Sequence, residues 1–307
     1  MTLAPGTTSP PHRLDDVPGW FPALDQLLFE WFLDRQESSG MRGDLLELGV
    51  YMGKSAIFLG RHLQNAERYT VCDLFEGSAP DDANKAESTK SYGALTRRAF
   101  EENYVSFHDA LPRVLQGPSS VVPAEVAADS CRFVHIDASH LYEHVYDDIG
   151  AARDALLPGG VVVLDDFRSE HTPGVAVAAW EAVLTRGLRP ICLSTQKLYG
   201  TWDDPGPVQE ELLAAMRERE DCHLSVQQAA GHRIVRFKSK KGMQAPPFPP
   251  SRYASRPNPD ADRTLTQQGG SAAPRRSRTR RIAVDLLPPV LTRAIRGARA
   301  GRGSGAR

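Results

Sequence analysis

The chain is organised around the stretch Asp44-Leu45-Leu46-Glu47-Leu48-Gly49-Val50-Tyr51-Met52-Gly53-Lys54-Ser55. This stretch opens with an apolar run of strand type, turns on glycine, and continues into a helical pattern. A strand, a glycine turn and a helix together form the crevice in which nucleotide-like ligands bind at the carboxyl edge of a parallel sheet. Glycine lets the backbone approach such a ligand, and the free N–H groups of the helix face it. The stretch therefore predicts an α/β protein with a ligand site at this edge.

Two common glycine loops do not fit this stretch. A phosphate loop has four residues between its first glycine and the Gly-Lys-Ser, whereas only three separate Gly49 from Gly53. A dinucleotide-binding loop of the form G-x-G-x-x-G would need glycine where Tyr51 and Lys54 stand. An ordinary strand-to-helix turn in an α/β protein is the structural alternative.

A third pattern, the E-x-G-x-x-x-G-x-S loop of class I methyltransferases, fits without a gap. More narrowly, Glu-Leu-Gly-Val-Tyr-Met-Gly-Lys-Ser-Ala resembles the cofactor loop of the catechol O-methyltransferase-like families. The resemblance implies S-adenosylmethionine as the cofactor. It also implies that the methionine end of this cofactor is held by residues of the loop, namely Glu47, Gly49, Tyr51, Gly53 and Ser55.

The second predicted strand, residues 69–73, ends in Asp73, about twenty residues beyond the glycine loop. In crevices of this kind an acid at that point accepts hydrogen bonds from ribose hydroxyls. A solvated turn aspartate is the alternative. The following Leu-Phe-Glu-Gly resembles the same position in the macrocin O-methyltransferase-like family.

Further along the chain, strand and helix patterns alternate. Alternation of this kind predicts a doubly wound, mostly parallel sheet with helices on both faces, and the resemblance implies the seven-stranded, Rossmann-like methyltransferase sheet. Residues 76–91 are polar and predict a mobile substrate loop, and residues 231–238 are strand-like without an assigned partner. The predicted strands are 44–49, 69–73, 104–108, 131–136, 161–164, 189–194 and 197–202, and the predicted helices are 21–37, 53–65, 92–103, 140–157, 173–186 and 208–219.

Three aspartates follow the fourth and fifth strands, at the edge where the crevice opens. Asp137 follows residues 131–136, and Asp165 and Asp166 follow residues 161–164. Desolvating three carboxylates together is costly, and a divalent cation with oxygen ligands offsets that cost. Catechol O-methyltransferase-like families hold their metal at these places, so the resemblance implies a magnesium site. A helix N-cap with a solvated turn, or a Walker B strand, are the alternatives.

The resemblance also assigns two further residues. His140 stands where the catechol enzymes have a lysine that acts as general base, and histidine can accept a proton at neutral pH. This departure leaves the base assignment as an expectation. Asp109 lies in a turn that in these families is near the adenine, and capping of the following helix is the alternative role.

Taken together, these motifs predict an S-adenosylmethionine-dependent, divalent-metal-dependent O-methyltransferase acting on a hydroxyl of a small molecule such as a catechol, a sugar or a secondary metabolite. The resemblance covers about residues 40–200, and its motifs occur in the expected order. The alternatives are a P-loop-like NTPase and a non-catalytic S-adenosylmethionine-binding protein. The resemblance further implies a homodimer.

Charge is distributed unevenly along the chain. Residues 240–307 hold 15 Lys and Arg against 3 Asp and Glu, and the remaining residues hold 22 against 35. The acidic body disfavours a nucleic-acid substrate. The chain divides into a disordered N-terminus (1–18), a methyltransferase domain (19–240) and a basic, Pro-, Arg- and Gly-rich tail (241–307) expected to be disordered. A short amphipathic helix within 275–299 that touches an acidic surface is the alternative for the tail.

The spacing of the cysteines and the hydropathy of the chain indicate the cellular compartment of the protein. The four cysteines lie far apart without a C-x-x-C pair, which is typical of reduced core residues rather than a disulfide framework or zinc site. Neither a signal peptide nor an 18-residue apolar run is visible. We therefore expect a cytoplasmic protein without a transmembrane segment.

Overall fold

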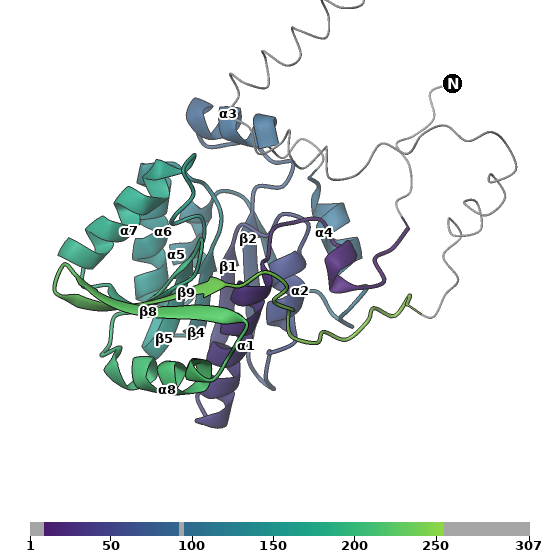
Figure 1. Ribbon diagram of the computed structural model, residues 1–307. Helices are drawn as coiled ribbons and strands as arrows, with labels where there is room; N and C mark the ends of the chain where they lie inside the picture. Colours follow the sequence, from purple (N-terminus) through teal and green to yellow (C-terminus); the bar gives the residue numbers. More distant parts are fainter. Residues whose placement is uncertain (1–8, 92–94, 255–307) are drawn as a thin grey trace, which may run out of the picture. The chain divides into compact units, whose positions relative to one another are not determined.

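The computed structural model describes residues 9–91 and 95–254 (Figure 1). Their strands form one nine-stranded sheet, and the predicted ligand site lies at an edge of this sheet. The strand order is β3-β2-β1-β4-β5-β7-β6-β9-β8. The five strands from β3 to β5 are mutually parallel, β7 is antiparallel to both neighbours, and β8 is antiparallel to β9. The strands are β1 (Asp44–Leu48), β2 (Tyr69–Asp73), β3 (Arg113–Gln116), β4 (Cys131–Ile136), β5 (Leu156–Leu164), β6 (Arg189–Leu193), β7 (Leu198–Thr201), β8 (Cys222–Ala229) and β9 (His232–Ser239).

Helices cover both faces of this sheet, which confirms the doubly wound α/β prediction. One apolar core includes buried side chains of α1, α2, α4 and α8, and a second core includes those of α6 and α7. The helices are α1 (Ala23–Ser38), α2 (Lys54–Gly60), α3 (Asp82–Ser91), α4 (Arg97–Tyr104), α5 (Val122–Glu125), α6 (Tyr142–Ala155), α7 (Pro173–Thr185) and α8 (Gly206–Arg217), with the 3-10 turns η1 (Leu14–Asp16) and η2 (Ser119–Val121).

The central strands are buried on both faces, as parallel strands covered by helices must be. Every residue of β4 is buried, and so are the last four residues of β1. This explains why both strands appear in the sequence as nearly continuous apolar runs, and why their positions were predicted correctly.

The third strand was predicted wrongly. Residues 104–108 do not form a strand, because the backbone N–H groups of Val105 and Phe107 donate to carbonyls of α4 and extend the end of that helix. The strand lies instead at Arg113–Gln116, where it pairs with β2. Alternation of aromatic and polar residues at 104–108 resembled a strand, but Tyr104 faces the core as the last residue of a helix.

The expected loop at residues 76–91 contains a helix, α3. Its first turns are polar and mostly exposed, with Asn84 the buried side chain. The sequence of α3 is mostly polar, so it has no 3.6-residue hydrophobic period and gives no helical signal.

The sheet has nine strands instead of the expected seven. The strand-like segment 231–238 corresponds to β9, which pairs in parallel with β6 and antiparallel with β8. Strand β8 was not predicted: it is the edge strand, and all of its residues after Cys222 are exposed. Its first residues alternate between apolar and polar side chains, but the run is short and its apolar residues Leu224 and Val226 are exposed.

The folded part extends beyond both expected boundaries. Residues 1–8 and 255–307 lie outside the described residues, so the predictions for them are not tested. Residues 9–18, expected to be disordered, include η1 with Leu14 and Val17 buried. Near the other boundary, Ser251 donates through its backbone N–H to the His12 carbonyl at 2.9 Å and through its hydroxyl to the Pro11 carbonyl at 2.6 Å.

The last two features of the fold are the state of the cysteines and the apolar length of the helices. The four cysteines are unpaired and buried, as expected for core residues. Within the described ranges, none of the helices combines the length and apolar character that crossing a bilayer requires.

Candidate active site

A cavity of about 720 Å³ opens at the carboxyl ends of β1, β2, β4 and β5, where the glycine loop meets the aspartates. Of the residues predicted for the site, the structure brings eight together in its wall: Gly49, Tyr51, Ser55, Asp73, Asp137, His140, Asp165 and Asp166. Three predicted residues do not line it: Glu47, Gly53 and Asp109.

Gly49 allows the ends of β1 and β4 to approach each other. Its φ is +79°, and a Cβ placed there would lie 2.0 Å from the carbonyl oxygen of Asp137. The two strand ends are joined by the hydrogen bond from the Asp137 N–H to the Leu48 carbonyl at 2.7 Å. Glycine is therefore required both by the left-handed backbone and by the close packing.

Asp73 organises the glycine loop from the end of β2. Its Oδ2 accepts the backbone N–H groups of Val50 (2.8 Å) and Tyr51 (3.0 Å), and its Oδ1 accepts that of Phe75 (2.7 Å). Burial raises the pKa of Asp73, and the three backbone donors act in the opposite direction. The carboxylate thus both lines the cavity and fixes the loop that faces the ligand.

Glu47, predicted to contact the cofactor, does not line the cavity. Glu47 is fully buried, accepts a hydrogen bond from the Tyr69 hydroxyl, and lies 2.8 Å from Nδ1 of His135. Its side chain points into the sheet's packed layer instead of the cavity. It belongs to a buried polar network beneath the site.

Gly53 and Asp109 also lie outside the cavity wall. Gly53 precedes α2 with φ +92° and packs against Phe100, so it turns the chain into the helix. Asp109 is exposed and pairs with Arg252 at 3.0 Å. The residues that follow β3, 117–120, line the cavity, and Asp109 does not.

The three aspartates have different partners. Asp166, with φ +53°, lies between His140, whose Nε2 is 3.1 Å from its Oδ2, and Ser169, whose hydroxyl donates to its Oδ1 at 2.5 Å. These hydrogen bonds hold the pKa of Asp166 below its usual value although burial acts against them. Asp165 contacts the buried ammonium of Lys197. Burial raises the pKa of Asp137.

Two groups at the cavity could hold a metal ion by the proximity of their ligand atoms. Asp137, His140 and Asp166 each offer one atom within 4.8 Å of the others, and His135, Asp137 and Asp165 do the same. All members of the first group line the cavity, which suits a cation that must reach a substrate. His135 is fully buried and lies outside the cavity wall.

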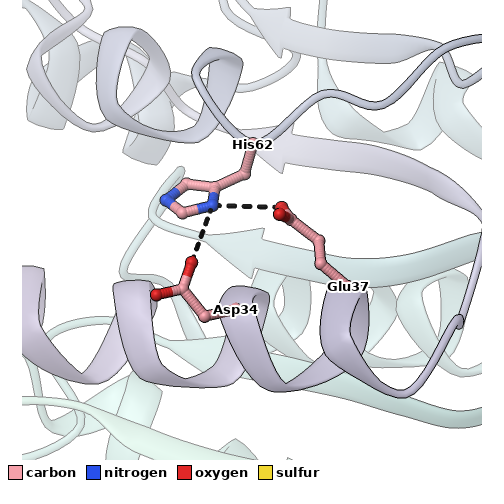
Figure 2. A group of neighbouring side chains, drawn as sticks. All are labelled: Asp34, Glu37 and His62. Carbon is pink, nitrogen blue, oxygen red and sulfur yellow. Dashed lines mark hydrogen bonds and ion pairs between the residues drawn. The ribbon is translucent and has the colours of Figure 1, made fainter.

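A third group, Asp34, Glu37 and His62, lies away from the cavity (Figure 2). Nδ1 of His62 faces Glu37 at 3.1 Å and Asp34 at 3.6 Å. Burial lowers the pKa of His62 to about 4, so the ring is neutral at pH 7. The guanidinium of Arg132, 3.9 Å from Glu37, already supplies a positive charge here. We interpret this group as structural.

Several residues of the site carried no usable sequence signal. Trp20 lines the cavity, is 77% exposed, and stacks on Tyr51 at 5.9 Å between ring centroids. The ammonium of Lys54 donates to the Gly19 carbonyl at 3.2 Å, which ties the segment before α1 to the glycine loop. His144 bridges Ser139 (3.0 Å) to Asp81 (2.9 Å). Except for the contact between His144 and Ser139, these contacts join segments distant in sequence.

Comparison with known proteins agrees with this geometry. Residues 46–167 match a family model described as a methyltransferase domain. A curated relative from Streptomyces olivaceus, 8-demethyl-8-(2,3-dimethoxy-alpha-L-rhamnosyl)-tetracenomycin-C 4'-O-methyltransferase, is 29% identical over 159 residues, which is 47% of this chain and 59% of the relative. The chain thus matches somewhat more than half the length of that relative.

Among solved structures, the O-methyltransferase NovP is similar at a TM-score of 0.48 and 19% identity, covering 57% of this chain and 78% of NovP. TomG from Streptomyces achromogenes, an O-methyltransferase solved in complex with SAM, is similar at a TM-score of 0.32 and 18% identity, covering 72% of this chain and 80% of TomG. The family match thus places a region similar to a methyltransferase domain at residues 46–167 of this chain.

Proposed function

We propose that the protein transfers the methyl group of S-adenosylmethionine to a hydroxyl group of a small molecule. The observation that carries this proposal is that one cavity holds two chemically distinct sets of residues. The glycine loop with Asp73 forms one set, and Asp137, His140 and Asp166 form the other. The first set suits a nucleoside-type cofactor and the second suits deprotonation of an acceptor.

In the cofactor half, Gly49, Tyr51 and Ser55 are proposed to hold the methionine end. Asp73 is proposed to accept hydrogen bonds from ribose hydroxyls through the lone pairs left free by its three backbone donors. The turn 117–120 is proposed to contact the adenine, in place of Asp109. Fixing both reactants in line within one cavity can contribute roughly 7–11 kcal/mol to lowering a bimolecular barrier.

In the acceptor half, His140 is proposed as the general base. Asp166 orients the imidazole through the 3.1 Å contact to Nε2, and Ser169 fixes the other carboxylate oxygen. The hydroxyl proton passes to His140 while the acceptor oxygen forms its bond to the methyl carbon and the sulfonium C–S bond breaks. The carboxylate then stabilises the imidazolium, as a fixed anion does beside a histidine base.

A divalent cation, magnesium by preference, completes the proposal. The donor chemistry fits, because carboxylate oxygens of Asp137 and Asp166 at the cavity wall are the hard ligands that magnesium prefers. When bound, the cation would act as a Lewis acid that lowers the pKa of the acceptor hydroxyl. The variant His140→Gln separates the two roles available to this histidine. If His140 is the general base, the variant should lose turnover and keep its affinity for magnesium. If His140 is a metal ligand, the variant should lose both.

The acceptor is proposed to be a sugar or another secondary-metabolite hydroxyl. The relative from Streptomyces olivaceus is named for methylation at a position of a rhamnosyl tetracenomycin. The cavity of about 720 Å³ is within the size range of small-molecule sites. The acidic body of the chain gives no electrostatic reason to expect a nucleic acid.

The test is formation of S-adenosylhomocysteine from S-adenosylmethionine in the presence of glycosylated and catecholic acceptors, with and without a chelator. The proposal predicts acceptor-dependent product that is lost in His140→Gln and reduced by chelation. Asp109→Asn, a change far from the cavity wall, is the matched control and should behave as wild type. A non-catalytic S-adenosylmethionine-binding protein would bind the cofactor and give no product with any acceptor.

A phosphate-loop NTPase is not favoured. The lysine that such a loop aims at phosphates is here Lys54, whose ammonium is bound to the Gly19 carbonyl. Homodimer formation and a cytoplasmic location are further proposals, which gel filtration of the purified chain and microscopy of a tagged chain would test.

A further inference from the structure

A buried lysine lies at the end of β5, beneath the carboxylates of the site. The antiparallel register pairs Leu164 of β5 with Leu198 of β7, which brings the preceding Lys197 beside Asp165. The Lys197 side chain is 1% exposed, and its ammonium contacts Oδ2 of Asp165. Its backbone is fixed as well, because Lys197 N–H donates to the Ser194 hydroxyl at 2.9 Å. The ammonium therefore has a defined place.

The surroundings of this ammonium are strongly acidic. Burial lowers the pKa of Lys197, and the nearby Asp137, Asp25 and Glu47 act in the opposite direction. Removing one partner of a buried ion pair leaves the other charge uncompensated, which is costly. The contact between Lys197 and Asp165 therefore gives each of the two buried groups a partner of opposite charge.

Asp165 and its neighbour Asp166 have separate environments although they are adjacent in sequence. The Asp165 side chain is 8% exposed and faces the ammonium, with Nε2 of His135 3.7 Å from Oδ2. The Asp166 side chain is 23% exposed and is held on the cavity side by His140 and Ser169. A cation in the cavity would therefore contact the more exposed carboxylate of Asp166, whereas the carboxylate of Asp165 is already paired with an ammonium.

We propose that the ammonium of Lys197 is a built-in cation that occupies Oδ2 of Asp165. Asp165 then serves as the partner of Lys197 and not as a metal ligand, and a divalent cation is held from Asp137 and Asp166. Lys197 is a positioning residue in this account, because it acts through Asp165. The inference rests on the metal-binding part of the proposed function and corrects the ligand set expected from the sequence.

The test uses the full-length protein and Mn²⁺ or Mg²⁺ as the probe, without acceptor. Metal affinity is measured by calorimetry for wild type, Asp165→Asn and Asp166→Asn, and Tm is measured with and without MgCl₂ for Lys197→Met. The double variant Lys197→Met/Asp165→Asn removes both charges and shows whether the fold tolerates their joint loss. Exposed Lys238, on β9, provides the control Lys238→Met.

Asp165→Asn should keep the wild-type metal affinity to within about threefold, whereas Asp166→Asn should weaken it by about tenfold or more. In Lys197→Met the uncompensated Asp165 should accept the added metal, so MgCl₂ should raise Tm more than in wild type or Lys238→Met. The double variant should lose that additional rise. Equal loss of affinity in Asp165→Asn and Asp166→Asn would overturn the inference.

Other outcomes are equally decisive. Lys197→Met that stays unfolded at every MgCl₂ concentration, while the double variant folds, would show that metal cannot replace the ammonium and would overturn the proposal. If wild type binds S-adenosylmethionine but no metal, the metal part of the proposed function fails. The inference about Lys197 is then decided by Lys197→Met alone. A rise in Tm on addition of MgCl₂ would support it, and no rise would overturn it.

Discussion

His140 and Asp166 face each other from the ends of neighbouring strands, with 3.1 Å between Nε2 of the imidazole and Oδ2 of the carboxylate. The hydroxyl of Ser169 holds the second oxygen of Asp166 at 2.5 Å, so the carboxylate has little freedom to rotate. A histidine oriented in this way, in the wall of a cavity, is arranged to accept a proton from a bound hydroxyl. This pair is the chemical centre of the proposed reaction.

The first prediction concerns this pair. Removing the proposed base in His140→Gln should lower kcat by about 100- to 10,000-fold, which is the usual contribution of general base catalysis. The affinity for S-adenosylmethionine should stay unchanged, because His140 belongs to the acceptor half. Steady-state kinetics and calorimetry check the two parts, with Glu218→Gln, an exposed change in the turn after α8, as control.

The second prediction concerns the two halves of the cavity. Asp73→Asn removes the negative charge and replaces one of the two oxygens that accept backbone N–H groups by an NH2 donor. It should weaken S-adenosylmethionine binding by about tenfold or more, since a charge-assisted hydrogen bond contributes about 1.5–3 kcal/mol. Glu47→Gln should reduce stability and leave cofactor affinity unchanged, because Glu47 lies outside the cavity wall. Calorimetric titration of S-adenosylmethionine into each variant measures the two affinities. Equally weakened binding in Asp73→Asn and Glu47→Gln would contradict the assignment of Asp73 to the cofactor half of the cavity.

The third prediction concerns Gly49. Gly49→Ala places a methyl group 2.0 Å from the Asp137 carbonyl oxygen, so β1 and β4 must separate. The matched control is Gly231→Ala, with φ +77° and no atom within 4 Å of the added Cβ. The control should cost about 1–2 kcal/mol of unfolding free energy from its left-handed backbone alone. Gly49→Ala should cost several kcal/mol more or abolish folding, as measured by urea denaturation.

The fourth prediction concerns pH. Burial raises the pKa of Asp148 on α6 to about 6. The native state therefore binds this proton more tightly than the unfolded chain, and the associated stability is lost as pH rises through about 6. Asp148→Asn keeps the shape without the charge, so it should stabilise the protein by about 2–3 kcal/mol at pH 7.5 and by little near pH 4.

Urea denaturation at several pH values measures this difference. Asp154→Asn, an exposed change on the same helix, serves as the control. A constant difference between Asp148→Asn and wild type from pH 4 to pH 7.5 would show that Asp148 titrates normally in the folded protein.

Sequence reasoning located those parts of the site that follow buried strands. β1, β4 and β5 are apolar runs ended by glycine or acid, and parallel strands of this kind bring their carboxyl ends to one edge. Gly49, Asp137 and Asp166 therefore met at the cavity as predicted. The order of strands β3 to β5 is likewise the one that a doubly wound sheet requires.

The failures have a common physical origin in contacts between segments distant along the chain. Lys197 reaches Asp165 only because β7 runs antiparallel to β5, a register that no local pattern encodes. Glu47 occupies the acidic position of the loop motif, but His135 and Tyr69 across the sheet hold it in the core. The helix α3 is a separate case, because its mostly polar sequence has no apolar period.

The most direct test of the central claim is calorimetric titration of S-adenosylmethionine and ATP into wild type and Asp73→Asn. We predict that S-adenosylmethionine binds wild type in the micromolar range or tighter, about −8 kcal/mol or more favourable. Asp73→Asn should weaken that binding, and ATP should not bind either protein. Binding of ATP without binding of S-adenosylmethionine would contradict the assignment of the cavity.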